Sequence, residues 1–311
     1  MPNPFPAIAN RVQRLLAGTA CGLALCTASV AHATPLTLWS AGSLNAALSE
    51  VTRDFTAATG TPVTTKFLSS GTLRQQIEAG GRPDVFASAD IGNPAALQAE
   101  GLAGPVVNFA SNRIVAVARA NAGVTSANLL STILSPSVRL GTSTPISDPQ
   151  GDYEEQVFAK ADALTPGAKA ALDAKALRLV GGPASPVVPA GQNSLIYFID
   201  TTSQADVFLT YYTSAIAAVA LARDLTEVDL PASLAVSAQY GETIVNGAQP
   251  GAAALESYIL SAPAQVVLAA NGFGPPAPVP EPPSAVLLAL GIAGLAATGA
   301  RRRRETVQTT L

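Results

Sequence analysis

The sequence predicts an α/β protein with mostly parallel, doubly wound sheets. Short apolar runs typical of buried strands alternate with segments of helical periodicity along most of the chain. The stretch 67–90 is the clearest unit: a strand end, the turn Ser69-Ser70-Gly71, a helix from Thr72 and a second strand at Val85–Ala87. Ser70 stands where a side chain can cap this helix, and the free N–H groups of a first helical turn can hold an anion.

The other elements follow from the same two periodicities and from glycine and proline at their ends. The predicted strands are 36–39, 63–67, 85–87, 114–118, 139–140, 177–180, 206–210, 226–230 and 234–236. The predicted helices are 44–59, 72–79, 91–102, 126–134, 153–163, 168–176, 195–200, 214–222, 252–260 and 264–269.

The first 33 residues have the features of a secretory signal peptide. Two arginines precede an apolar run from Leu15 to Val30, and Ala31-His32-Ala33 is a small-x-small cleavage pattern. The chain's two cysteines and its one histidine all lie in this segment. The exported protein is therefore expected to lack disulfides, Cys/His zinc sites, Ser-His-Asp triads and cysteine nucleophiles, which makes an enzyme the poorest of the functional classes.

The charge of the chain argues against a nucleic-acid partner. The 311 residues carry 18 Lys and Arg against 21 Asp and Glu, a net charge of −3. Leaving out residues 1–33 and 275–311 removes six arginines and two glutamates, so the folded part carries about −7. An acidic domain can bind an anion only through locally aimed donors, because its overall field opposes the ligand.

The C-terminal segment is separate from the folded part. Residues 275–283 form a proline-rich linker, 284–300 an apolar stretch long enough to span a membrane at the lower limit, and 301–311 a basic tail that begins with four arginines. The arginines would keep the C-terminal end of the span on the cytoplasmic side.

Five polar positions follow strands, where ligands bind in open α/β sheets. They are Ser43, Ser70, Gln150, Asn193 and Tyr211. Each has a simpler interpretation taken singly, since serine is a common helix cap and Pro-x-Gly a common turn. Together they form a set of neutral donors, which suits a fully deprotonated oxyanion, whereas a monohydrogen anion such as phosphate would also need an acceptor.

The acidic residues of the helix start at 148–155 could indicate a cation site or a general acid. Acidic side chains also favour a helix N-terminus electrostatically, and we prefer that interpretation for Asp148, Asp152, Glu154 and Glu155. Nucleotide-binding glycine motifs of the P-loop or dinucleotide type are absent from the sequence. We therefore expect neither a metal cation nor a cofactor.

Several motifs in combination resemble the molybdate-binding periplasmic proteins of ABC importers, over residues 35–274. The motifs are Ala41-Gly42-Ser43-Leu44, Ser69-Ser70-Gly71-Thr72-Leu73, Asp84-Val85-Phe86-Ala87-Ser88-Ala89-Asp90, Asp148-Pro149-Gln150-Gly151-Asp152-Tyr153 and Asn271-Gly272-Phe273. The resemblance implies a two-lobed type II periplasmic-binding-protein fold, each lobe a mostly parallel sheet flanked by helices, which closes on molybdate or tungstate and passes it to an ABC permease.

The resemblance also implies which residues bind. Ser43, Ser70 and Tyr211 match the family's side-chain ligands, and its two backbone N–H contacts fall near Gln150 and Asn193. The family often has Ala and Val at those last two positions, so Gln and Asn are departures that leave selectivity open.

The same resemblance predicts the domain organisation. Residues 34–112 and 214–274 are expected to form lobe 1 and residues 113–213 lobe 2, with hinges near 112–114 and 209–213.

A second resemblance concerns the tail. Val279-Pro280-Glu281-Pro282, the apolar stretch and the arginine cluster are similar to a PEP-CTERM sorting signal. It implies an exosortase-type sorting enzyme as partner, and a protein that is exported to the periplasm or outer cell surface and at least transiently anchored through residues 284–300. Two alternatives therefore stay open: a surface or extracellular-matrix interaction module that retains the fold, and a receptor for another oxyanion such as sulfate.

Overall fold

The computed structural model describes residues 34–276, and the predicted signal peptide, apolar span and basic tail, with all of the proline-rich linker after 276, lie outside these residues. The strands are β1 Leu36–Ala41, β2 Val63–Leu68, β3 Val85–Ser88, β4 Val107–Arg119, β5 Leu140–Ser143, β6 Leu177–Val180, β7 Val207–Tyr211, β8 Leu225–Asp229 and β9 Ser237–Ile244. The helices are α1 Asn45–Thr59, α2 Ser70–Glu78, α3 Gly92–Ala99, α4 Leu129–Leu134, α5 Pro149–Leu164, α6 Ala168–Lys175, α7 Ser194–Ile196, α8 Tyr212–Leu221, α9 Ala252–Ile259 and α10 Ala262–Ala270. Short 3₁₀ turns stand at η1 Gly42–Leu44 and η2 Ala120–Ala122, and a π-helical turn at η3 Tyr197–Thr201.

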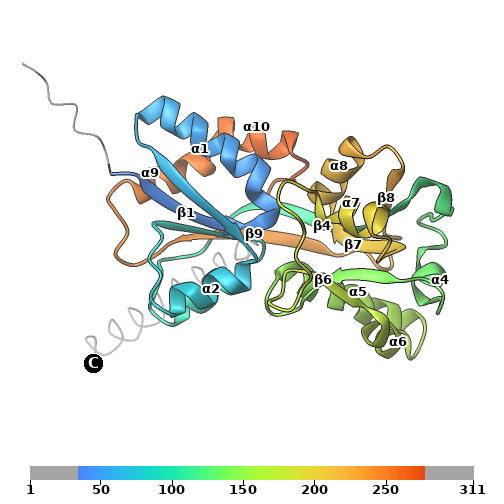
Figure 1. Ribbon diagram of the computed structural model, residues 1–311. Coiled ribbons are helices and arrows are strands. Elements are labelled where there is room, and N and C mark those ends of the chain that lie inside the picture. Colours follow the sequence, from blue (N-terminus) through green and yellow to red (C-terminus); the bar gives the residue numbers. More distant parts are fainter. Residues whose placement is uncertain (1–33, 277–311) are drawn as a thin grey trace, which may run out of the picture. The chain divides into compact units, whose positions relative to one another are not determined.

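The strands are joined in the order β2-β1-β3-β9-β4-β7-β5-β6, with β8 also paired to β4 (Figure 1). Parallel pairs join β2, β1 and β3, and again β6, β5 and β7. The pairs that involve β4 and β9 are antiparallel. We call β2, β1, β3, β9 and the first half of β4 the first sheet, and the second half of β4 with β8, β7, β5 and β6 the second sheet.

Strand β4 belongs to both sheets. Residues 107–113 pair with β9, and residues 114–119 pair with β7 and β8. The change of partners falls at 112–114, where the sequence predicts a hinge. Residues 209–213, the other expected hinge, include the end of β7 and the start of α8, and here β7 pairs with β4 in the second sheet. The chain returns to the first sheet further on, through residues 230–236. Strand β8 lies after residue 213, in the part of the chain predicted as lobe 1, but it pairs with β4 in the second sheet.

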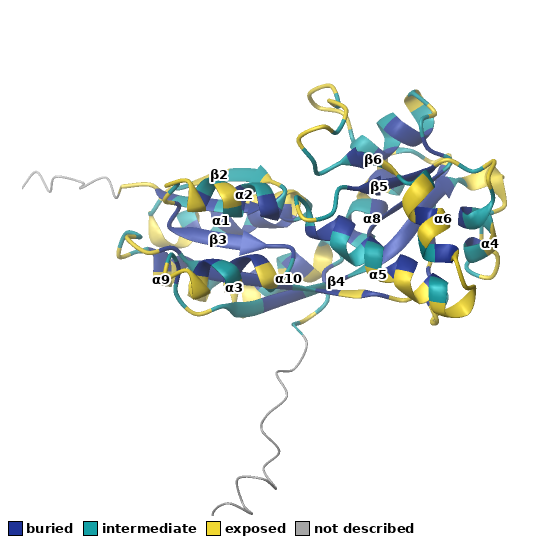
Figure 2. Ribbon diagram, turned by 90° about the horizontal axis from the view of Figure 1, so that it is seen from below, coloured by how far each residue is buried: buried dark blue, intermediate teal, exposed yellow. Residues whose placement is uncertain are grey.

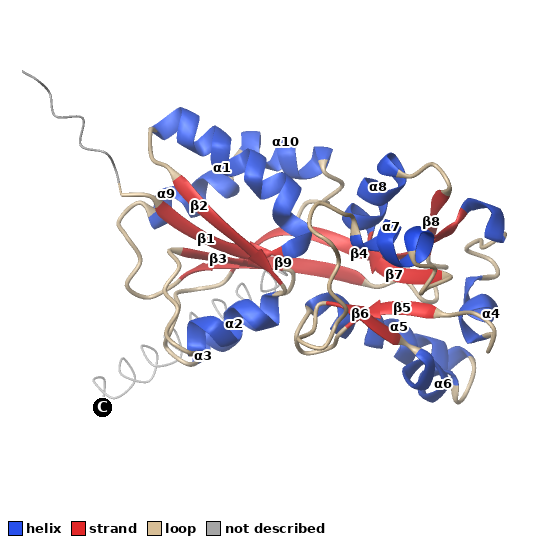
Figure 3. Ribbon diagram, viewed as in Figure 1, coloured by secondary structure: helices blue, strands red, loops and turns tan. Residues whose placement is uncertain are grey.

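Helices cover both faces of each sheet (Figure 3). The residues of β4 alternate between faces: Val115 and Val117 pack with α8 and η3, whereas Ala116 and Ala118 pack with the core toward α4, α5 and α6. In the first sheet, α2 and α3 pack on one face through Leu73 and Leu97, and α1, α9 and α10 belong to the core of the other. Strands β3, β5 and β7 are buried along their whole length and are dark blue in Figure 2, whereas the edge strand β2 is intermediate to exposed.

Three differences from the sequence prediction matter for the site. Strand β9 was missed because Gly241 and the buried acid Glu242 interrupt its apolar alternation. Residues 107–113 of β4 were missed because they include the polar Asn108, Ser111 and Asn112. Helix α5 begins at Pro149, four residues before the predicted Tyr153, with Asp148 as its cap. Helix α2 begins at Ser70 itself, so the predicted capping role of Ser70 is wrong and Ser69 holds the N-cap position.

Within residues 34–276 no single helix is long and apolar enough to cross a membrane. Helices α9 and α10 together reach that length and composition, but they are bent by 56° at the break between them.

Candidate functional site

A cavity of about 330 Å³ lies where the ends of β1, β2 and β7 meet the start of α5. It is lined by Ala41, Gly42, Ser43, Leu68, Ser69, Asp148, Gln150, Gly181, Ser194, Tyr211 and Ser214. Three of the five predicted binding residues are therefore together in one cavity: Ser43, Gln150 and Tyr211. Both sheets contribute to its wall.

Tyr211 is the last residue of β7, and its hydroxyl is buried without a partner. The side chain is 2% exposed, and Oη has no hydrogen-bond partner among the described residues. The ring lies edge-on to Tyr153 and Tyr240, with centroids 6.3 and 5.7 Å away. Burial raises the pKa of Tyr211 well above its ordinary value, so the phenol stays protonated and is a donor. Buried polar groups are nearly always paired, so this orphan donor in a cavity wall points to a ligand.

Ser43 lies in η1, half-buried, with its hydroxyl 3.0 Å from Tyr240 Oη. Asn112 Nδ2 donates to the same phenol oxygen at 3.2 Å, so the phenol proton can go to Ser43 Oγ. That arrangement leaves the Ser43 proton free for the cavity. Asn112 Nδ2 also donates to Thr213 Oγ1 at 3.0 Å, which ties the first sheet, the crossing strand and α8 together beneath the cavity.

Gln150 does not offer its side-chain amide to the cavity. Its Nε2 donates to Glu154 Oε1 at 2.9 Å, and its Oε1 accepts from Thr210 Oγ1 at 3.2 Å. Its backbone N–H, the group implicated by the family resemblance, donates to Asp148 Oδ1 at 3.2 Å. Gln150 can therefore bind a ligand only through its backbone N–H, which already donates to Asp148.

Ser70 and Asn193 do not line this cavity, although the residue beside each of them does. Ser70 is fully buried, and its Oγ accepts from the Ala89 N–H at 3.0 Å. Asn193 caps α7, with Oδ1 accepting from the N–H groups of Leu195 and Ile196 at 3.0 and 3.3 Å. Their side chains are engaged in local structure. Ser69 and Ser194 line the cavity instead, and the Ser69 hydroxyl also lies 2.8 Å from Thr72 Oγ1.

Sequence reasoning missed Ser69, Ser194 and Ser214 as lining residues. All three stand at helix N-termini, the signal that could have indicated them. No side chain caps α2 or α8, so the first N–H groups of these helices remain available at the cavity. The wall thus combines hydroxyls with helix N-termini, an arrangement that attracts anions through directed donors.

Asp148 is the exception in this donor-rich wall. It caps α5, and its Oδ2 accepts from Ser143 Oγ at 2.7 Å. Burial raises the pKa of Asp148, and the negative charges of Asp152 and Asp90 raise it further. Asp148 is thus the N-cap of α5, and its side chain accepts from the Gln150 N–H, so it has a structural place at the helix N-terminus. Within residues 34–276 no group of His, Cys, Asp and Glu could hold a metal ion.

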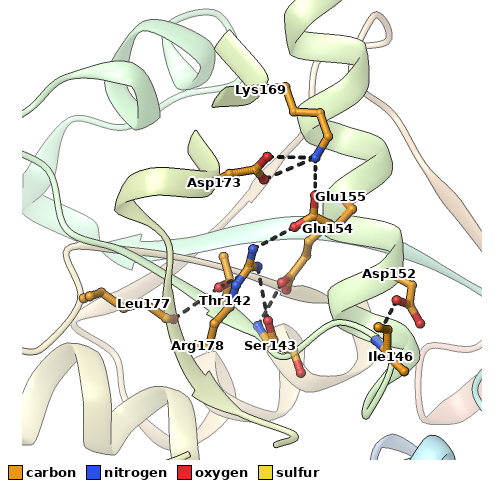
Figure 4. A network of polar contacts seen from close by, with 10 residues as sticks. All are labelled: Thr142, Ser143, Ile146, Asp152, Glu154, Glu155, Lys169, Asp173, Leu177 and Arg178. Atoms are coloured by element: carbon orange, nitrogen blue, oxygen red, sulfur yellow. Dashed lines mark hydrogen bonds and ion pairs between the residues drawn. The ribbon is translucent and has the colours of Figure 1, made fainter. Parts of the chain in front are cut away.

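A polar network fixes α5 against the second sheet (Figure 4). Ser143 N–H donates to Glu154 Oε2 at 2.8 Å, and Arg178 Nη2 pairs with Glu155 Oε1 at 2.7 Å. Lys169 bridges Glu155 and Asp173. Burial raises the pKa of Glu154 well above its usual range. These contacts position the first turn of α5, and with it the Gln150 N–H.

Two α/β sheets that share a crossing strand and enclose a cavity of hydroxyls and helix N-termini define a solute-binding protein of the periplasmic type. The chain belongs to the family described as bacterial extracellular solute-binding protein, whose model matches residues 36–274. This family consists of binding proteins and not enzymes, which confirms the prediction from the sequence that the protein is not an enzyme. Membership implies a solute ligand and components of an ABC transporter as partners.

Two relatives are similar in sequence. An uncharacterized protein of Pasteurella multocida (strain Pm70) is 34% identical over 177 residues, which cover 56% of this chain and 72% of that protein. The molybdate-binding protein ModA of Escherichia coli (strain K12) is 36% identical over 83 residues, which cover 27% of this chain and 32% of ModA.

Solved structures share the fold. The periplasmic molybdate-binding protein of Azotobacter vinelandii matches with a TM-score of 0.61 and 20% identity, over 78% of this chain and 99% of that one. The sulfate-binding protein SubI of Mycobacterium tuberculosis H37Rv matches with a TM-score of 0.62 and 19% identity, over 79% and 88%. The predicted α/β periplasmic-binding-protein fold is thereby confirmed.

Proposed function

We propose that this protein is an exported receptor for a tetrahedral oxyanion, molybdate or tungstate, which it delivers to an ABC permease. The observation that carries the proposal is the buried Tyr211 hydroxyl, which has no partner among residues 34–276 and lies in a cavity with Ser43 and two uncapped helix N-termini. Such donors satisfy the oxygens of an anion without a counter-cation. The similarity to two molybdate-binding proteins supports the choice of ligand.

The binding motion we propose is closure about the crossing segments. Strand β4 changes partners at 112–114, and the chain returns to the first sheet just before β9. A ligand that accepts from Ser43 on one side and Tyr211 on the other interacts best when the two sheets are close, so it favours the closed state.

A titration of the purified protein with molybdate, tungstate and sulfate tests the receptor function. Ligand at about 100 times Kd stabilises the folded state by about 2.7 kcal/mol, so the Tm should rise with at least one of these anions. Ser43→Ala should weaken binding, whereas Ser49→Ala, on the exposed side of α1, should not. An unchanged Tm with every anion would refute an oxyanion receptor.

Sulfate is the second candidate ligand, favoured by the structural match to a sulfate-binding protein. Molybdate and sulfate are both tetrahedral dianions, so the same titration decides between them by affinity. A surface interaction module would bind neither anion.

We further propose, from the PEP-CTERM resemblance alone, that an exosortase-type enzyme recognises the tail. On this proposal the protein is held at the inner membrane through residues 284–300 before any processing and then reaches the periplasm or outer surface.

A further inference from the structure

Asp148 places a carboxyl group in a cavity wall whose other polar residues are neutral. The residue is half-buried and lines the cavity with Ser43 and Tyr211. Its carboxyl group packs against Gly181, where an added Cβ would lie 2.5 Å from both Asp148 Cβ and Oδ2. Gly181 has φ +79, a conformation that suits glycine. The loop after β6 is thus shaped closely around the Asp148 side chain.

The neighbours of Asp148 leave its oxygens with acceptor capacity. Oδ1 accepts one long bond from Gln150 N–H and Oδ2 one from Ser143 Oγ, whereas a carboxylate can accept about four. The contacts to Asp148 from β5, α5 and the loop after β6 therefore do not saturate it.

The charged groups around Asp148 are mostly acidic. Asp152 and Glu154 stand on α5 and Asp90 follows β3. The neighbouring Arg178 of β6 is paired with Glu155 and contacts the Ser143 carbonyl. Tyr211 of β7 and Tyr240 of β9 also face this region, and burial raises the pKa of both, so they are neutral. A second negative charge in the cavity is therefore disfavoured unless a proton accompanies it.

An oxyanion that accepts from Tyr211, Ser43 and the Gln150 N–H competes with Asp148 for the last of these donors. Two acceptors that share a site repel each other, and one proton between them turns the repulsion into a strong hydrogen bond. The ligand can supply this proton, as hydrogen phosphate does, or the proton can be taken up onto Asp148 when a dianion such as sulfate binds.

We propose that the cavity binds its oxyanion together with one proton, held between the ligand and the Asp148 carboxyl group. This inference rests on the proposed oxyanion-receptor function. A site built of donors alone would bind a fully deprotonated ligand with the same affinity at every pH. A site that shares a proton with Asp148 would not.

Calorimetric titration of the purified protein with sulfate tests the inference, because sulfate stays a dianion from about pH 5.5 to about pH 8.5 and only the protein titrates. Sulfate affinity should fall by up to about tenfold per pH unit above the pKa of Asp148. Titrations in two buffers of different ionisation enthalpy should show the uptake of close to one proton in the basic half of the range.

Asp148→Asn keeps an oxygen to cap Gln150 and removes the charge. This variant should bind sulfate more tightly near pH 8, without the pH dependence, and its ratio of phosphate to sulfate affinity should fall. Asp152→Asn is the matched control, since it removes one charge from the same helical turn outside the cavity and should keep the wild-type slope.

Sulfate binding without pH dependence or proton uptake in the wild type would overturn the inference and leave the receptor function standing. The inference would also be overturned if folded Asp148→Asn kept the wild-type dependence of sulfate affinity on pH, or the wild-type ratio of phosphate to sulfate affinity. If that variant does not fold, proton uptake by the wild type decides alone. Failure of every oxyanion to bind at any pH would instead refute the receptor function, and the inference with it.

Discussion

Gly71 of α2 lies directly against the backbone of Ile146, across the boundary between the two sheets. A Cβ built on Gly71 would stand 2.2 Å from the Ile146 carbonyl oxygen and 2.8 Å from that of Ser147. Ile146 itself has φ +70, which is unusual for a β-branched residue, and its N–H donates to Asp152 Oδ1 at 2.8 Å. The first turn of α2 therefore meets the loop that precedes α5 through bare backbone beside the cavity.

Gly71→Ala should weaken oxyanion binding because neither carbonyl can move without separating the sheets. We expect a loss of affinity of about tenfold or more, equivalent to about 1.4 kcal/mol, with a smaller change in the Tm of the ligand-free protein. Gly104→Ala is the matched control, since its added Cβ meets one backbone oxygen at an ordinary 3.6 Å. Calorimetric titration measures both variants, and equal affinities would contradict a closing contact at Gly71.

Tyr211→Phe should leave the ligand-free protein as stable as the wild type or more so. The hydroxyl it removes has no partner among residues 34–276, and an unpaired buried donor costs about 1–3 kcal/mol of folding free energy. Oxyanion affinity should fall by about tenfold or more, because a charge-assisted hydrogen bond is lost. Urea denaturation and ligand titration give the two quantities, and a stability loss at unchanged affinity would refute a ligand role for this phenol.

Tyr240→Phe should lower stability, in contrast to Tyr211→Phe, although the two rings are neighbours with centroids 5.7 Å apart. Its hydroxyl is bonded to both Ser43 and Asn112, so its removal should lower the free energy of unfolding by about 1–3 kcal/mol. Affinity should also fall, because Ser43 loses the partner that orients it. The same denaturation experiment applies, and stabilisation by Tyr240→Phe would show that this network does not support the folded state.

Ser69→Ala and Ser70→Ala should separate binding from folding. Ser69 lines the cavity, so its replacement should reduce oxyanion affinity with little effect on Tm. Ser70 accepts from the buried Ala89 N–H, so its replacement should lower the unfolding free energy by about 1–3 kcal/mol. The pair is compared by titration and thermal melting. A selective affinity loss in Ser70→Ala alone would restore Ser70 as the ligand that the resemblance implies.

Glu242 should make stability depend on pH. Both carboxyl oxygens are buried without a partner among the described residues, and burial, with a smaller contribution from Glu256, raises its pKa well above the usual range. The folded state therefore holds a proton that the unfolded state releases above about pH 4.3, so this contribution to stability is lost as pH rises through the folded pKa.

Glu242→Gln removes that titration. Its unfolding free energy relative to the wild type should increase by up to about 1.4 kcal/mol per pH unit from about pH 4.3 up to the folded pKa of Glu242. Urea denaturation at several pH values measures this difference. A difference that is constant with pH would mean that Glu242 is not held neutral.

The sequence by itself determined the fold class and most elements, because periodicities of two and 3.6 residues report directly which positions are buried. It also indicated Ser43, Gln150 and Tyr211 as neighbours, because the ends of strands gather at one edge of such sheets. Strand β9 was missed since its buried positions include an acid, Glu242.

Only the tertiary structure decided which side chain of each neighbouring pair faces the cavity. In each pair the N-cap residue is extended and its neighbour begins the helix, so the two side chains point in different directions. Ser69 and Ser194 line the wall, whereas Ser70 and Asn193 bond to nearby backbone. The structure also placed Asp148 among the donors, because α5 begins four residues earlier than its apolar pattern does. The direction of these side chains and the position of Asp148 in the cavity wall depend on contacts between distant segments. A local sequence pattern does not predict such contacts.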